Sequence, residues 1–112
     1  MIQLPASYYN YNHHLPFDWQ EVICLQAQGN YTIFVFEEKP QYISTKTLES
    51  YELHLPPNFL RINKSCIVRR EYIVRIAKKS KVVYFSDGRF AKIARRRWTF
   101  FKKYAGQEIS TL

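Results

Sequence analysis

Two short groups of polar side chains in this 112-residue chain have the types and spacing that suit contact with nucleic acid. The first is Asn63-Lys64-Ser65 and the second is Arg95-Arg96-Arg97. Lysine suits a phosphate or a guanine edge, arginine a guanine edge, asparagine an adenine edge, and serine a phosphate. Two plainer interpretations stay open: a solvated strand edge protected from aggregation by its charges, and a solvated basic helix end.

Apolar residues on both sides of the first group would fix its position. The segment 59–73, FLRINKSCIVRREYI, alternates apolar anchors with cationic or hydrogen-bonding side chains. Leu60 and Ile62 precede the group, Cys66 and Val68 follow it, and all four need a core on which to pack. We therefore expect residues 63–65 to project from a rigid β frame.

The charge of the chain is unevenly placed. The formal net charge is +8; residues 1–60 hold two Lys/Arg against six Asp/Glu, whereas residues 61–112 hold fifteen against three. This asymmetry predicts an anionic partner for the C-terminal half, with nucleic acid the first candidate and an anionic membrane surface the second. Phosphate contacts are expected from Arg61, Asn63, Ser65, Arg69, Arg70, Arg95 and Arg97.

Length and composition predict one globular domain, since 46% of the residues are hydrophobic and 17% are aromatic. The chain opens without the regions of a signal peptide, and no apolar run approaches the ~20 residues of a membrane-spanning helix. We expect a cytoplasmic protein without membrane contact. Cys24 and Cys66 lie in apolar, strand-like surroundings, which favours buried thiols over a disulfide.

Catalytic and metal sites are not expected. His13 and His14 are adjacent, but no third and fourth ligand is spaced to join them. The carboxylates are scattered, whereas a nuclease would need paired acids or a positioned histidine base. We therefore expect no metal, no cofactor, no small-molecule substrate and no enzymatic activity.

The hydrophobic pattern predicts a mostly β fold of antiparallel hairpins, because the connections of two to four residues are too short for parallel crossovers. Asp87-Gly88 between alternating runs is the strongest hairpin signal. An irregular N-terminal arm (1–17) would precede a domain over 18–106, and a short tail (107–112) would follow. Outside the central segment, the expected strands cover 21–27, 31–37, 41–44, 72–76, 81–86 and 89–93.

Two short helices complete the prediction. One covers 46–54, where Thr45 can cap the N-terminus, Leu48, Tyr51 and Leu55 recur on one face, and Pro56-Pro57 ends the helix. The other covers 94–104, with Trp98 and Phe101 on its apolar face and Gly106 as its end. The three arginines at its start have the wrong charge for the helix dipole, which suggests that an anion is expected there.

Taken in order, these segments resemble a LytTR-type DNA-binding domain. The similarity covers about residues 18–105, and the central segment FLRINKSCIV is its most specific part. The motifs that carry it are GNY at 29–31, STKTL at 44–48, PPNFLRINKSCIV at 56–68, YIVRI at 72–76, DG at 87–88 and IARRR at 93–97.

The resemblance implies an elongated fold of small antiparallel sheets in which loops enter the major groove. By position it implies base contacts from Asn30, Lys64 and Arg96. Three departures are visible: Arg69 stands where the family commonly has asparagine, Ala94 replaces a serine that would bind phosphate or cap the helix, and no receiver domain precedes the motifs.

These observations predict a sequence-specific transcriptional regulator of double-stranded DNA. The resemblance implies direct-repeat sites bound by paired domains, hence a possible homodimer on DNA. The alternative is a β module that binds nucleic acid non-specifically or as single strands, through aromatic side chains on a basic sheet. Its candidate stacking residues are Tyr31, Phe34, Phe36, Tyr84 and Phe85. An adaptor for another protein is a further class, indicated if no nucleic acid binds at low salt.

Overall fold

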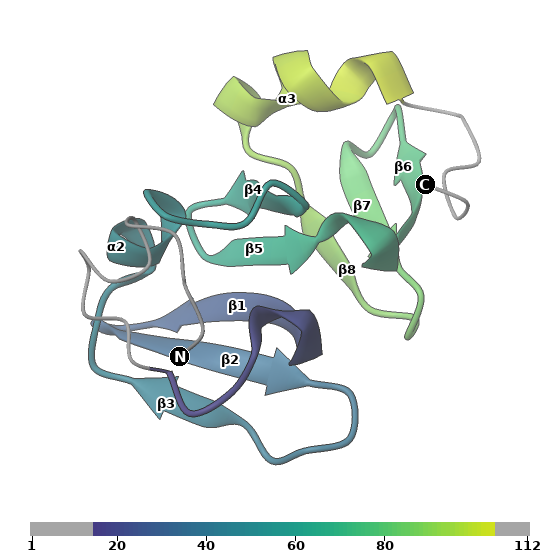
Figure 1. Cartoon of the computed structure of the whole chain (residues 1–112). Coiled ribbons are helices and arrows are strands. Elements are labelled where there is room, and N and C mark those ends of the chain that lie inside the picture. The colour runs from purple at the N-terminus through teal and green to yellow at the C-terminus, as the bar shows by residue number, and fades with distance from the viewer. Residues whose placement is uncertain (1–14, 105–112) are drawn as a thin grey trace.

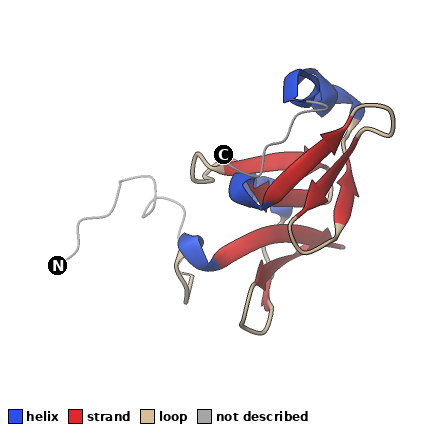
Figure 2. Cartoon of the chain, turned by 90° about the vertical axis from the view of Figure 1, so that its right-hand side faces the viewer, coloured by secondary structure: helices blue, strands red, loops and turns tan. Residues whose placement is uncertain are grey.

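The computed structural model describes residues 15–104, whose strands form two antiparallel sheets (Figure 1). A five-stranded sheet has the order β3-β2-β1-β5-β4, and a three-stranded sheet has the order β6-β7-β8. The molecule measures 46 × 30 × 27 Å along its principal axes, with α3 at one end and β3 at the other (Figures 1 and 2). The mostly β class is confirmed. Residues 1–14 of the expected arm, the tail 107–112 and Gly106 lie outside the described residues.

The five-stranded sheet is built from hairpins and one long-range pairing. The pairs β1–β2, β2–β3 and β4–β5 are hairpins, whereas β1 pairs with β5 across forty or more residues, with Cys24 opposite Val68 and Gln26 opposite Cys66. The strands are β1 (Val22–Gln28), β2 (Tyr31–Phe36), β3 (Tyr42–Ser44), β4 (Phe59–Asn63) and β5 (Cys66–Arg69).

The three-stranded sheet is a meander of β6 (Ile73–Ala77), β7 (Val82–Phe85) and β8 (Phe90–Lys92). Its second turn carries the predicted Asp87-Gly88 pair. The Asp87 carboxylate accepts hydrogen bonds from the Arg89 backbone N–H and from Arg89 Nε at 3.0 and 2.8 Å. This local hydrogen bonding is what makes aspartate a favourable turn residue.

The mid-chain helix α2 (Leu48–Glu52) is shorter than predicted, and its cap is different. Thr47 precedes it in an extended conformation and accepts a hydrogen bond from the Ser50 N–H, so Thr47 rather than Thr45 is the N-cap. Lys46 lies outside the helix. Its carbonyl accepts a hydrogen bond from the Thr32 hydroxyl of β2 at 2.8 Å. Leu48 and Tyr51 are buried, as their spacing predicts.

The C-terminal helix α3 covers Arg95–Phe101 and tightens into the 3-10 turn η3 (Lys102–Tyr104). Ala94 occupies its N-cap without a side-chain hydrogen bond, so the helix cap that a serine would supply is absent. Phe101 is buried and Trp98 is half-buried, which confirms the predicted apolar face. Two further 3-10 turns are η1 (Trp19–Glu21) and η2 (Arg70–Tyr72).

Two apolar clusters hold these elements together. One joins the two sheets and α3 through Ile62, Val68 and Phe101, among others. The other lies beneath α2 and includes Phe34 and Tyr51, with Phe17 packed on its aromatic side. Burial on this scale, at about 25 cal/mol per Å² of apolar surface, is the main stabilising contribution to a small domain.

Cys24 and Cys66 are free thiols buried on the same face of β1 and β5, as the sequence predicts. They lie diagonally across the strand pair and not directly opposite each other. Burial in apolar surroundings raises the pKa of Cys24 to about 11 and that of Cys66 to about 12. Both thiols are therefore protonated and inert near neutral pH.

Candidate nucleic-acid interface

The β1–β2 turn carries Asn30 at the surface. Gly29 in this turn has a φ of +61°, a left-handed conformation that glycine adopts without steric cost. Asn30 is exposed. Two residues before the turn, the Ala27 N–H donates to the Ser65 carbonyl at 2.9 Å, so the turn is tied to the β4–β5 turn beside it.

The β4–β5 turn presents Lys64 and Ser65, both exposed, from two strands whose apolar residues are buried. Asn63 shapes this turn from within. Its Oδ1 accepts the Ser65 N–H at 2.7 Å, and its Nδ2 donates to the Lys92 carbonyl at 2.6 Å. Asn63 therefore links the turn to β8, with both ends of its amide already engaged.

Arg61 lies in the interior, with only 5% of its side chain exposed. Its Nε donates to the Asn63 carbonyl at 2.6 Å and its Nη2 to the Lys64 carbonyl at 2.8 Å. Its Nη1 forms an ion pair with Glu52. Arg61 thus holds the Lys64 turn from below and has no exposed face for the phosphate contact predicted for it.

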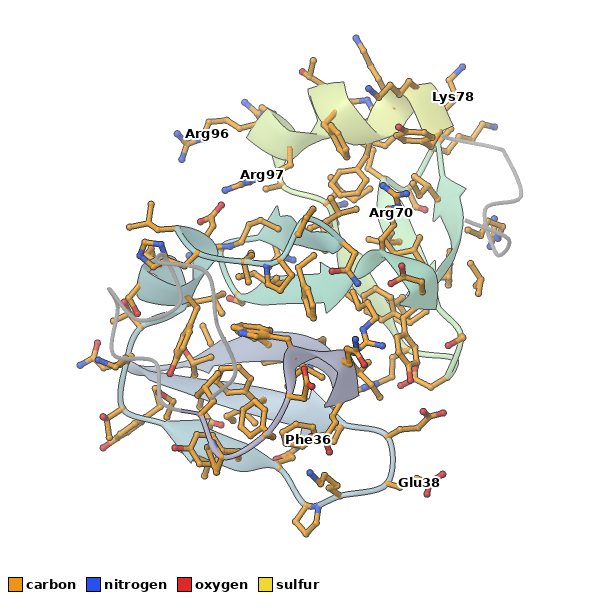
Figure 3. All side chains as sticks on the ribbon, viewed as in Figure 1. Phe36, Glu38, Arg70, Lys78, Arg96 and Arg97 are labelled. Atoms are coloured by element: carbon orange, nitrogen blue, oxygen red, sulfur yellow. The ribbon has the colours of Figure 1, made fainter. Side chains whose placement is uncertain are left out.

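The junction of β8 with α3 is joined to the same strand. The Ala94 N–H donates to the Ile62 carbonyl at 3.0 Å, which sets the start of α3 beside β4. Arg96 is exposed and extends away from the helix end, whereas Arg97 turns back and pairs with Glu52 at 3.1 Å (Figure 3). Arg95 is also exposed.

These three segments form one row along a side of the molecule (Figure 1). The β1–β2 turn is bonded to the β4–β5 turn through Ala27, and the β4–β5 turn is bonded to the β8–α3 junction through Asn63. The Lys64 turn is therefore the middle member. We call the three segments, residues 29–30, 64–65 and 94–96, the loop row.

The structure brings together some of the predicted site residues and separates others. Lys64, Asn63, Arg96 and Arg97 line one open groove between α2 and α3, and Asn30 and Ser65 lie beside it on the loop row. Arg69 and Arg70 stand at the opposite end of β5, about 13 Å from the Lys64 turn at ~3.3 Å per strand residue.

Arg69 and Arg70 also have different surroundings. The Arg69 guanidinium donates to the carbonyls of Trp19 and Gln20, and so it fastens η1 to the sheet. Arg70 is exposed beside a small apolar pocket that it shares with Phe100 and Tyr104. Neither side chain joins the loop row.

Sequence reasoning missed Glu52, which is the centre of the polar network. One carboxylate oxygen pairs with Arg61 and the other with Arg97, so α2, β4 and α3 are tied at one point. Glu49, one turn earlier, lies 3.4 Å from Arg61. A hydrogen bond to its own backbone, and then one from Arg61, hold the pKa of Glu49 below its ordinary value. The spacing of two acids on a short helix does not reveal these long-range partners.

Within residues 15–104 no group of three or more His, Cys, Asp or Glu side chains is placed to hold a metal ion. His13 and His14 lie outside that range. The helices of the described part are also too short and too polar to cross a membrane.

Two comparisons with known proteins found matches, one with a family model and the other with solved structures. The family model described as the LytTr DNA-binding domain matches residues 13–106. Among solved structures, a similar one is described as the LytTr DNA-binding domain of a methyl-accepting/DNA response regulator from Bacillus cereus. It has a TM-score of 0.69 and 23% sequence identity, and the match covers 82% of this chain and 87% of that chain. At this identity the likeness concerns the fold. A search of curated proteins finds no match.

Proposed function

The chain belongs to the LytTR family of DNA-binding domains, and on that premise we propose that it regulates transcription by binding specific sequences of double-stranded DNA. The family is one of DNA-binding domains of the response-regulator type and not of enzymes. The observation that carries the proposal is the loop row, which exposes three different polar side chains from one rigid side of the domain.

Each loop offers a side chain suited to a base edge in the major groove. Asn30 can bond an adenine through its N6 and N7 groups, Arg96 can bond a guanine through O6 and N7, and Lys64 suits a guanine or a phosphate. Each good contact of this kind is worth ~1–3 kcal/mol of discrimination against a wrong base. Because the Lys64 turn lies between the other two, its base pair should lie between theirs.

The remaining polar residues divide into phosphate contacts and supports. Ser65 and Arg95 are exposed at the row and suit phosphate oxygens. Arg61, Asn63 and Arg97 are engaged with neighbouring carbonyls and carboxylates, and we assign them to holding the row in place. For Arg69 and Arg70, a direct phosphate contact would require the duplex to reach beyond the row.

Single-strand binding is the competing function, and burial of the aromatic residues disfavours it. Stacking on bases needs exposed rings. Of the five candidate rings, Phe34, Phe36 and Phe85 are buried, with exposures of 0%, 8% and 8%. Tyr31 is 51% exposed, and Tyr84 is half-buried with the Arg75 guanidinium 4.4 Å from its ring centroid.

Selection from a random duplex library tests the proposal. The enriched duplex would then be compared with scrambled duplex and with single strands over a range of salt concentrations. We expect an enriched motif that binds over ~10³-fold more tightly than scrambled DNA. Equal affinity for every duplex would refute specific regulation. A preference for single strands would establish the competing function.

We further propose that two copies bind directly repeated sites, as the resemblance implies. The selected motif would then contain two half-sites in the same orientation. Band-shift titrations on one and on two half-sites measure this directly, since a second, slower complex should form only on the repeat. A single half-site in every enriched duplex would contradict the paired arrangement.

A further inference from the structure

The open groove between α2 and α3 combines cations of the loop row with two acids of α2. Its volume of about 760 Å³ lies within the size range of ligand-binding clefts. Lys64 and Arg96 belong to both the groove and the loop row, so a duplex that binds the row would lie at the mouth of the groove. Four cations and two carboxylates line it: Arg61, Lys64, Arg96 and Arg97 against Glu49 and Glu52.

Two of the four cations are neutralised within the groove. Glu52 pairs with Arg61 through one carboxylate oxygen and with Arg97 through the other. Glu49 adds a second carboxylate 3.4 Å from Arg61. Within residues 15–104, neither of the two cations that the groove shares with the loop row forms an ion pair. The uncompensated positive charge of the groove is therefore confined to the two side chains that are suited to base edges.

Glu49 is the more accessible of the two acids. Its side chain is 69% exposed, against 29% for Glu52. A hydrogen bond to its own backbone, and then one from Arg61, hold the pKa of Glu49 below its ordinary value, so the carboxylate is ionised at neutral pH. A phosphate that entered the groove would meet this negative charge at short range and would be repelled.

We propose that Glu49 and Glu52 determine specificity by excluding DNA phosphates from this groove, so that Lys64 and Arg96 are left to contact base edges. This inference rests on the proposed function, because it concerns how the loop row meets a duplex. Without the two acids, four neighbouring cations would attract the backbone of DNA of any sequence. With them, the backbone gains little from the groove, and tight binding depends on the match between the row and the bases.

Glu49→Gln and Glu38→Gln are a matched pair of variants that tests the inference. Each removes one negative charge from an exposed glutamate, but Glu38 lies on the β2–β3 turn, at the end of the molecule away from Arg96 (Figure 3). Fluorescence anisotropy measures the affinity for the selected duplex and for a scrambled duplex of the same length, between about 50 and 200 mM salt. Melting temperatures show that both variants are folded.

Glu49→Gln should bind scrambled DNA more tightly than the wild type and with a steeper salt dependence. One additional phosphate contact raises the slope of log K against log salt by about 0.9, which corresponds to about 3-fold in affinity between 50 and 200 mM salt. The selected duplex should change less, because its backbone is already placed by the base contacts. The ratio of the two affinities should therefore fall by up to about 3-fold at the lowest salt, and Glu38→Gln should keep the wild-type ratio.

Glu52 is tested through the cation that it releases. Glu52→Gln frees the half-exposed Arg97 for a phosphate, so the affinity for scrambled DNA should also rise. Arg61 stays buried against the two backbone carbonyls that it bonds. Glu52→Gln/Arg97→Gln removes the released cation, and the gain should disappear. A gain that persists in this double variant would overturn the role of Glu52.

The two duplexes separate failure of the inference from failure of the proposed function. Equal gains on the selected and the scrambled duplex in Glu49→Gln, or the same loss of ratio in Glu38→Gln, would overturn the inference. The acids would then act only through the net charge of the domain. Absence of sequence preference in the wild type would instead refute the proposed function itself.

Discussion

Arg61 was predicted to contact phosphate, but in the structure it supports the Lys64 turn. Its place in the basic segment FLRINKS, three residues before Lys64, led us to expect a phosphate contact. The structure instead buries its guanidinium against two backbone carbonyls and Glu52. Arginine suits this position because its planar donors can serve several acceptors at once.

Replacement of Arg61 by Met should therefore destabilise the domain. Met keeps an unbranched stem but leaves the carbonyls of Asn63 and Lys64, and one oxygen of Glu52, without a donor. Loss of a buried charge partner costs about 3–5 kcal/mol, and the partial exposure of Glu52 reduces this to roughly 2–3 kcal/mol. Urea unfolding measures the change. Arg97→Gln is the control, since its half-exposed pair with Glu52 should contribute about 1 kcal/mol or less; an equal loss in both variants would refute the special role of Arg61.

At the scale of single residues, the exposure of Lys64 and Ser65 on the loop row could be predicted from the sequence. Lys64 and Ser65 lie between two apolar segments that had to be buried, so their projection from the frame was predictable. The role of Glu52 was not, because an ion pair between residues 52 and 97 leaves no trace in local spacing. Long-range polar contacts depend on the assembled fold.

At the scale of elements, hairpins and helix periodicity were predictable and exact boundaries were not. Asp87-Gly88 and Gly29-Asn30 mark turns by their conformational preferences, and both turns are present. Thr45 and Thr47 are chemically equal candidates for the cap of α2. Thr47 is the N-cap of α2, because the Lys46 carbonyl is held outside the helix by a hydrogen bond from Thr32 of β2. That bond is a tertiary contact.

The pairing of β1 with β5 predicts a pH dependence through its two thiols. The folded pKa of Cys24 is about 11 and that of Cys66 about 12, above the value of about 8.5 for an exposed thiol. The folded state therefore keeps its protons when the unfolded state loses them. The stability that the thiols contribute is complete below about pH 8.5 and is lost as the pH rises toward the folded values.

Each thiol should lower the free energy of unfolding by about 1.4 kcal/mol per pH unit in this range. Urea unfolding of the wild type and of Cys24→Ala/Cys66→Ala at several pH values from 8 to 10.5 measures the effect. The wild type should show the steeper decline, whatever the variant loses at pH 8 from its smaller side chains. Parallel curves would mean that the thiols are accessible to water in the folded state.

At the scale of the whole molecule, acidic and basic side chains are distributed unevenly along the long axis of the domain. The exposed β2–β3 turn, with Glu37 and Glu38, lies at the end of the molecule away from α3 (Figure 3). Arg95 and Arg96 of the loop row lie at the start of α3, at the other end of the molecule (Figure 3). Under the proposed function, a duplex would be attracted to the loop row and repelled from the acidic turn, which would orient the domain before any base contact forms.

The division into two sheets is the part of the fold that local patterns did not specify. Each predicted strand exists, yet nothing in a hairpin signal says that β5 pairs with β1 or that β6 begins a second sheet. Those choices follow from burial of Ile62, Val68 and Phe101 in a shared core. The resemblance to the LytTR family implied small antiparallel sheets, but it did not say which strands pair in each.

The central claim is that the loop row reads one duplex in a fixed order. Binding-site selection with the wild type and with Asn30→Ala, Lys64→Ala and Arg96→Ala tests it most directly, because each variant should lose preference at one base position only. The account predicts three separate positions, with that of Lys64 between those of Asn30 and Arg96. Loss of preference at a shared position, or a Lys64 position outside the other two, would contradict the arrangement of the loop row on DNA.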